Sequence, residues 1–190
     1  MFSLSTIPSI DIIIGPMYSG KSSELIRRLN IYSDMGMKVI FINSSLDNRD
    51  TTRLFSTHNK TIGEIEITTI KLSSLRTFVH TEYDVIGIDE AQFFPDLKDS
   101  VLNMVENFNK IVLIAGLNGD FRRQPFGQIL DLISYSDTIT KLHPFCSLCK
   151  DRDSNIKPAQ FTKRMDTSIS ETISVGNRYI PVCRKCYKLF

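Results

Sequence analysis

The fold is decided by the stretch Ile10-Asp11-Ile12-Ile13-Ile14-Gly15-Pro16-Met17-Tyr18-Ser19-Gly20-Lys21-Ser22. Its last eight residues match the pattern G-x-x-x-x-G-K-[ST], and they directly follow an apolar, β-branched run that predicts a strand. In such a loop the glycines allow backbone N–H groups to converge on phosphate oxygens, and the N-terminus of the following helix adds its dipole. The stretch therefore predicts a loop that binds the phosphates of a nucleotide.

Two side chains of this loop have expected roles. Lys21 would reach the β- and γ-phosphates, and the hydroxyl of Ser22 would ligate Mg²⁺. The alternative is a glycine-rich turn whose lysine only faces solvent. The position of the pattern, between a predicted strand and a predicted helix, favours the phosphate loop.

Four further apolar runs predict strands of the same sheet, at residues 38–42, 84–88, 110–115 and, less clearly, 138–142. Their apolarity is continuous rather than alternating, which is typical of parallel strands that are covered on both faces. Stripes of apolar residues at helical spacing lie between them, at 22–35, 96–109 and 125–136. The polar segment 50–63 shows no periodicity, so we expect a loop there. Strands that alternate with helices predict an α/β fold.

The composition is that of an ordinary globular protein. The 190 residues are 42% hydrophobic and 23% charged, with a formal net charge of +2. This charge is too small to argue for a nucleic-acid or membrane surface. The apolar runs are far shorter than the ~20 residues that a membrane helix needs. No secretory signal pattern opens the sequence, so we expect a cytoplasmic protein.

An acidic pair, Asp89-Glu90, ends the apolar run 84–88. This position is the carboxyl edge of a predicted strand, where doubly wound sheets bind their ligands. One carboxylate can hold Mg²⁺ while the other remains available for proton transfer. The alternative is a strand-end turn with solvated acids. The pair alone leaves the nucleophile open, because an ATPase would activate water with it and a small-molecule kinase would activate a substrate hydroxyl.

Aromatic residues follow two of the predicted strands. Phe93 comes after the acidic pair, and Phe121 and Phe126 come after the run 110–115. These three rings could wall a slot for a planar group, and Gln92 could read the edge of that group. Phenylalanines in loops more often anchor a core, so the sequence by itself favours a packing role for them.

The four cysteines form two C-x-x-C pairs, Cys146/Cys149 and Cys183/Cys186. Each pair can supply two thiolates to a tetrahedral Zn²⁺, and a closed four-thiolate site would be structural because no position stays open. Disulfides and metal-free thiols are the alternatives, and the absence of a secretory signal favours the metal. The character of the sequence changes near residue 143. We therefore expect a nucleotide-binding α/β domain over residues 1–143 and a zinc domain over 144–190.

Taken in order, these segments resemble the cellular-type (type II) thymidine kinases of animals, many bacteria and large DNA viruses. The resemblance extends from residue 10 to residue 187 and is carried by the phosphate loop, by Gly87-Ile88-Asp89-Glu90-Ala91-Gln92-Phe93-Phe94, by Gly116-Leu117-Asn118-Gly119-Asp120-Phe121 with Pro125-Phe126-Gly127, by Phe161-Thr162-Lys163-Arg164, and by Tyr179 before Val182-Cys183-Arg184-Lys185-Cys186. It implies a P-loop (RecA-like) parallel sheet flanked by helices, and a small zinc-ribbon domain that carries a lasso loop closing over the nucleoside.

The resemblance also implies an activity, the transfer of the γ-phosphate of ATP to the 5′-hydroxyl of thymidine, which gives dTMP for DNA precursor synthesis by salvage. Glu90 would be the general base, and Phe121 would stack on the thymine ring. The residues implied for ATP and Mg²⁺ are Gly15, Pro16, Met17, Tyr18, Ser19, Gly20, Lys21, Ser22, Asp47, Arg49, Asp89 and Gln92. Those implied for the nucleoside are Met17, Phe93, Leu117, Phe121, Phe126, Ile173, Ser174, Val175, Gly176 and Tyr179.

The partners implied are thymidine and ATP, with feedback inhibition by dTTP, a homotetramer, and no direct contact with nucleic acid or membrane. Asn118 and Asp120 differ from the residues common in the family, a change that could alter nucleoside preference, for example by admitting deoxyuridine. The alternative function is a P-loop ATPase with a zinc-ribbon nucleic-acid-binding module. Thymidine-dependent production of ADP, as opposed to salt-dependent binding of DNA, distinguishes the two.

Overall fold

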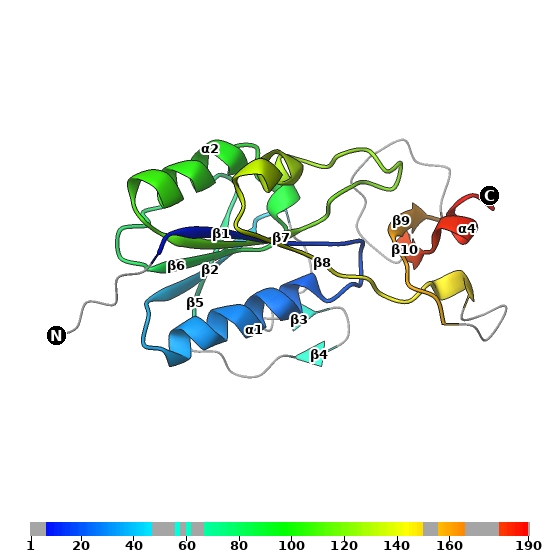
Figure 1. Cartoon of the computed structure of the whole chain (residues 1–190), viewed down its shortest axis with the longest axis horizontal. Helices are drawn as coiled ribbons and strands as arrows, with labels where there is room; N and C mark the ends of the chain where they lie inside the picture. Colours follow the sequence, from blue (N-terminus) through cyan, green and yellow to red (C-terminus); the bar gives the residue numbers. More distant parts are fainter. Residues whose placement is uncertain are drawn as a thin grey trace.

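The computed structural model describes residues 7–46, 67–149, 156–165 and 179–189, together with the backbone of 56–57 and 60–61. A six-stranded sheet forms its centre (Figure 1). In chain order the strands are β1 (Ser9–Ile14), β2 (Val39–Ser44), β5 (Thr68–Leu72), β6 (Val85–Ile88), β7 (Ile111–Gly116) and β8 (Thr138–Lys141). Their spatial order is β5-β2-β6-β7-β1-β8, and every neighbouring pair is parallel.

Helices cover both faces of this sheet. Helix α1 (Lys21–Asp34) lies on one face, below the sheet in Figure 1. The opposite face carries α2 (Leu97–Leu102), the π-helical segment η2 (Asn103–Asn107), and the 3-10 helices η1 (Ala91–Phe93) and η3 (Ile129–Tyr135). This arrangement is the predicted α/β fold with a flanked parallel sheet. Among the described residues, none of the helices has the length and apolarity that crossing a membrane requires.

The alternation of side chains along each strand divides the core into two layers. On β1, Ile10, Ile12 and Ile14 pack on the side of α2, whereas Ile13 packs on the side of α1. Successive side chains of a strand point to opposite faces, so a strand that is buried on both sides needs apolar residues at nearly every position. This requirement explains the continuous apolar runs in the sequence.

The five strands predicted from these runs are all present, with ends that differ by one or two residues. Strand β5 was not predicted, because its Thr68, Thr69 and Lys71 interrupt any apolar run at the edge of the sheet. The expectation of a loop over 50–63 was wrong for four residues. There β3 (Ser56–Thr57) and β4 (Lys60–Thr61) form a short antiparallel pair.

Two predicted helices differ in detail from the structure. The helix expected at 96–109 is regular only to Leu102 and continues as the wider η2, which ends at Asn107. Asn109 then adopts a left-handed φ of 53°. The helix expected at 125–136 is a 3-10 helix that starts at Ile129. It starts late because the chain first passes against Gln92. At Gly127, with φ of 62°, a Cβ atom would collide with the Gln92 backbone.

The cysteines belong to a smaller unit, drawn at the right of Figure 1. Strands β9 (Phe161–Arg164) and β10 (Tyr179–Val182) form an antiparallel pair, and helix α4 (Arg184–Tyr187) follows. Ala159 and Val182 pack with the four cysteines in a core cluster distinct from the two layers of the large sheet. The domain boundary near residue 143 stays a prediction.

Asp96, directly before α2, anchors the connection that follows β5. Its carboxylate accepts hydrogen bonds from Ser74 Oγ at 2.7 Å, from the Leu75 N–H at 3.2 Å and from the Arg76 N–H at 2.9 Å. Burial disfavours the charged carboxylate, but these donors outweigh the burial and hold the pKa of Asp96 below its ordinary value. The anchored segment places Leu75 in the core.

We expect Asp96→Asn to lower the free energy of unfolding at pH 7 by about 1–3 kcal/mol, because the amide N–H₂ would face the donors that the carboxylate now satisfies. Because the folded-state pKa is lowered, the carboxylate stabilises the protein fully above its unfolded-state pKa, and this stabilisation is lost as the pH falls through the folded-state pKa. Urea unfolding at several pH values should therefore show the difference from the parent shrinking in acid.

Asp99→Asn is the matched control, since the exposed Asp99 of α2 makes a long, 3.8 Å ion pair with Arg76. Its effect should stay within about 0.5 kcal/mol. Equal losses for the two variants, or a loss for Asp96→Asn that does not change with pH, would contradict the anchoring role.

Candidate active site and metal centre

The carboxyl ends of three adjacent parallel strands define the candidate site. In the paired registers, Ile14 of β1 lies opposite Gly116 of β7, and Ile88 of β6 lies opposite Ile114 of β7. The residues that follow, Gly15, Asp89 and Leu117, consequently leave the sheet at the same edge. Ligands of doubly wound sheets bind at this edge.

The loop over residues 15–20 turns sharply between β1 and α1. A Cβ atom at Gly15 would collide with the carbonyl oxygen of Leu142 and lie 2.8 Å from Ser19 Oγ. Gly20, with φ of 82°, takes the left-handed conformation that starts α1. Lys21 is buried, and its Nζ donates to the carbonyl oxygen of Pro16 at 2.9 Å.

This loop has the properties of a phosphate cradle. Among the described residues, the buried Ser19 Oγ has no hydrogen-bond partner, so a polar ligand atom could satisfy it. The first N–H groups of α1 have no acceptor within the helix and point toward the same loop. Ser22 lies in that first turn, next to the ammonium-bearing Lys21. The chemistry of these groups fits a phosphate and its accompanying cation.

The acidic pair lies beside this cradle at the end of β6. Asp89 is buried, and its N–H donates to the Ile42 carbonyl at 2.8 Å. Glu90 adopts a left-handed backbone conformation, with φ of 49° and ψ of 40°. This conformation is sterically unfavourable for residues other than glycine. Its Oε2 accepts a hydrogen bond from Gln92 Nε2 at 2.6 Å. Strained residues of this kind cluster at functional sites.

Gln92 connects the ends of β6 and β7. Besides donating to Glu90, it accepts from the N–H of Leu117 through Oε1 at 2.9 Å. The side chain fits because residue 116 is glycine, where a Cβ atom would lie 2.6 Å from that same Oε1. Sequence reasoning expected Gln92 to contact ligands and missed this bridging contact. Gly116 at the end of an apolar strand was the available signal.

The rings that were expected to wall a slot for a planar group lie in two contacting pairs. The rings of Phe93 and Phe126 meet edge to face, with centroids 5.6 Å apart. The ring of Phe121 lies 6.1 Å from the ring of Tyr179. The guanidinium carbons of Arg122 and Arg164 lie 5.0 and 5.1 Å from the centroid of Phe121.

The cysteine-containing unit contacts this site directly. The N–H of Met17, within the phosphate loop, donates to Thr162 Oγ1 of β9 at 3.0 Å. The hydroxyl of Tyr187 in α4 donates to the carbonyl oxygen of Phe121 at 2.8 Å. The sequence did not predict either contact, although Thr162 lies in one of the segments that carry the family resemblance and Tyr187 directly follows Cys186.

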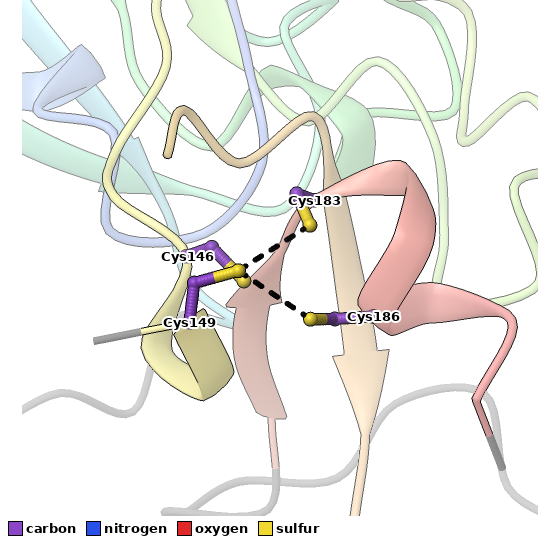
Figure 2. A group of neighbouring side chains, drawn as sticks. All are labelled: Cys146, Cys149, Cys183 and Cys186. Atoms are coloured by element: carbon purple, nitrogen blue, oxygen red, sulfur yellow. Dashed lines mark hydrogen bonds between the residues drawn. The ribbon is translucent and has the colours of Figure 1, made fainter. Parts of the chain in front are cut away.

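The four cysteines gather at one buried point, as Figure 2 shows. Their sulfur atoms all lie within 4.8 Å of one another, and the Sγ of Cys149 is 3.8 Å from that of Cys183 and 3.6 Å from that of Cys186. These separations exceed the S–S bond of about 2.05 Å. A tetrahedral zinc with Zn–S bonds of about 2.3 Å places its sulfurs about 3.8 Å apart. The cluster is therefore compatible with a structural zinc.

Burial and mutual contact shift the pKa values of these thiols. Burial, and then the neighbouring thiols, raise the pKa of Cys149 to about 12. Burial also opposes ionisation of Cys183, but the backbone hydrogen bond from Cys186 and the adjacent thiols lower its pKa to about 7. Zinc binds the thiolate form, so binding of the metal at such a site would release protons from these thiols.

Comparison with known proteins identifies the family. The family model described as thymidine kinase matches residues 8–187. The chain belongs to the thymidine kinase family. It is 43% identical to the thymidine kinases of monkeypox virus and variola virus over 179 residues, which cover 94% of this chain and 96% of each relative. The vaccinia virus (strain Western Reserve) thymidine kinase is 42% identical over the same shares.

Membership of the thymidine kinase family confirms the resemblance drawn from the sequence motifs, and the relatives' names favour a kinase over the ATPase alternative. A kinase of this family uses ATP as its phosphate donor. Six residues that the resemblance implied lie outside the described residues, namely Asp47, Arg49, Ile173, Ser174, Val175 and Gly176. The other implied residues lie in the segments that follow β1, β6 and β7, in the first turn of α1, or on β10, where the ring of Tyr179 lies near that of Phe121.

Proposed function

We propose that this thymidine kinase family member transfers the γ-phosphate of ATP to the 5′-hydroxyl of thymidine, giving ADP and dTMP. The proposal rests on the placement of the phosphate loop and the acidic pair at one edge of the sheet, in a chain whose relatives are named thymidine kinases. Phosphoryl transfer mainly requires positioning and neutralisation of charge, which a loop and a carboxylate pair can supply.

The loop residues would bind the nucleotide's phosphates. Lys21 and the backbone N–H groups of residues 15–22 would neutralise the phosphate oxygens, and Ser19 Oγ would gain the partner that it lacks among the described residues. Ser22 and Asp89 would hold Mg²⁺, which neutralises charge on the phosphates when it is bound. Asp47 and Arg49 would lie near the same phosphates.

Glu90 would act as the general base. Its carboxylate takes the proton of the 5′-hydroxyl while the nucleoside oxygen forms a bond to the γ-phosphorus. The bond between that phosphorus and the bridging oxygen breaks at the same centre, and ADP leaves with the electron pair. Gln92, which donates to Glu90 at 2.6 Å, would keep the carboxylate in its orientation.

The nucleoside would bind beside the loop that follows β7. Phe121 would stack on the thymine ring near Tyr179, with Met17, Phe93, Leu117 and Phe126 around it. Residues 173–176 would close over the nucleoside as a lasso, which excludes water as a competing nucleophile. From the family resemblance we also propose a homotetramer and feedback inhibition by dTTP.

Thymidine-dependent production of ADP by the parent protein tests the activity, and Glu90→Gln tests its mechanism. We expect this variant to bind ATP and thymidine normally while kcat falls by ~10²–10⁴, the usual contribution of a general base. Glu106→Gln is the matched control, because Glu106 is an exposed carboxylate on η2 and lies outside the loops that form the candidate site. ADP production at the same rate with and without thymidine would refute the kinase activity. Turnover of Glu90→Gln within a few-fold of the parent would refute the role of Glu90 as general base.

Phe121→Ala tests the stacking contact. In proteins that bind single-stranded nucleic acid, a base–aromatic stack contributes about 1–3 kcal/mol, so by analogy the KM for thymidine should rise roughly 5- to 150-fold. The KM for ATP should hardly change, because the ring of Phe121 would contact the nucleoside and not ATP. A packing defect would instead affect both substrates alike. Phe108→Ala, an exposed ring that packs on His80, is the control. Equal losses for both substrates with a lowered Tm would assign Phe121 to packing.

The cysteine centre should hold one Zn²⁺ per chain with four sulfur ligands from Cys146, Cys149, Cys183 and Cys186. Metal analysis measures the stoichiometry, and X-ray absorption identifies the ligands. Cys149→Ser should lose the metal and destabilise the unit, while the neighbouring Ser147→Ala should retain it. Active protein without metal, or oxygen or nitrogen atoms in the coordination shell, would contradict this assignment.

A further inference from the structure

Strand β9 lies between the cysteine centre and the candidate active site. Its alternate side chains point in opposite directions. Thr162 and Arg164 contact the site, through the Met17 N–H and the Phe121 ring. Lys163 points the other way and donates through Nζ to the carbonyl oxygens of Cys186 and Tyr187, both at 3.3 Å. The strand therefore attaches α4 on one side and the site on the other.

Tyr187 is held firmly within α4. Its N–H donates to the carbonyl oxygen of Cys183 at 2.9 Å, so two metal-centre cysteines lie within the same turn. Its ring lies 5.4 Å from the ring of Phe161 and 4.4 Å from the guanidinium carbon of Arg123. A side chain so fixed presents its hydroxyl at a defined position.

That hydroxyl reaches the loop that carries Phe121. The loop is folded on itself, because Oδ1 of Asp120 accepts from the N–H groups of Arg122 at 2.8 Å and Gln124 at 2.9 Å. The carbonyl of Phe121 points out of this turn and accepts from the Tyr187 hydroxyl at 2.8 Å. A bond to this carbonyl fixes the peptide plane next to the Phe121 Cα atom, and with it the direction in which the ring leaves the backbone.

We propose that Tyr187 is a positioning residue for the nucleoside. Its hydroxyl fixes Phe121 through the carbonyl oxygen, so the affinity for the nucleoside depends on the folded turn that contains Cys183 and Cys186. The inference rests on the proposed function, in which the Phe121 ring meets the thymine base. The contact involves the nucleoside side of the site, and the loop that would bind ATP is held by a different bond, from Met17 to Thr162.

Tyr187→Phe removes the hydroxyl and keeps the ring between Phe161 and Arg123. A single hydrogen bond of this kind corresponds to a change of about three- to tenfold. We expect the KM for thymidine to rise by this factor, with kcat and the KM for ATP within twofold of the parent. Tm and zinc content should stay unchanged. Tyr135→Phe is the matched control, because Tyr135 is exposed on η3.

Hydrogen–deuterium exchange provides a readout that does not depend on catalysis. Peptides that cover residues 117–126 should exchange faster in Tyr187→Phe than in the parent or in Tyr135→Phe. Unchanged exchange in this segment would overturn the proposal, even for a protein that shows no activity toward thymidine. A parent protein without thymidine-dependent ADP production would instead refute the proposed function.

A double-mutant cycle separates positioning from a general effect on the fold. In the Phe121→Ala background, Tyr187→Phe should change the KM for thymidine by less than twofold, because the ring that it positions is absent. The full three- to tenfold rise in that background would overturn the proposal. A parallel rise in the KM for ATP, in the single variant, would also overturn it.

Discussion

The close passage of the phosphate loop against the end of β8 is the constraint on which the rest of the structure depends. Gly15 has no room for a Cβ atom beside the Leu142 carbonyl, and Gly20 turns the chain so that α1 runs back across the sheet. The helix then packs so tightly on β6 that a Cβ atom at Gly87 would collide with Leu29. Gly87 lies two residues before Asp89. The packing of α1 on Gly87 therefore also fixes the distance between the phosphate loop, where α1 begins, and the acidic pair.

Local chemistry explains which parts the sequence could predict. Each strand and the phosphate loop is a continuous segment. Residues that are adjacent in the sequence therefore determine the burial of the strands and the turn of the loop. Strand β5 was not predicted because its position at the edge of the sheet tolerates the polar Thr68 and Lys71. The apolar stripe of 96–109 is compatible with a π-helical end as well as with a regular α-helical end, so it could not predict which one forms. The contacts of Thr162 with Met17 and of Tyr187 with Phe121 span 145 and 66 residues, and no local pattern encodes such distances.

The cysteine cluster lets a very small core support functional contacts. Among the described residues of that unit, the core cluster holds only Ala159 and Val182 as buried apolar side chains besides the cysteines. A core of this size gives little support to a hairpin and a four-residue helix. A metal held by Cys146, Cys149, Cys183 and Cys186 would close the long connection between the two pairs and add its binding free energy to folding. Contacts that β9 and α4 make with the site would then depend on that closure.

The left-handed backbone of Glu90 also bears on engineering. Glycine adopts this conformation without steric strain, whereas a glutamate held there costs about 1–2 kcal/mol. Selection of variants for thermal tolerance alone would therefore favour glycine at this position and discard the carboxylate that the proposed chemistry needs. Screens of variant libraries of this fold would have to measure turnover together with heat resistance, because the residue at position 90 that favours stability is not the one that the reaction needs.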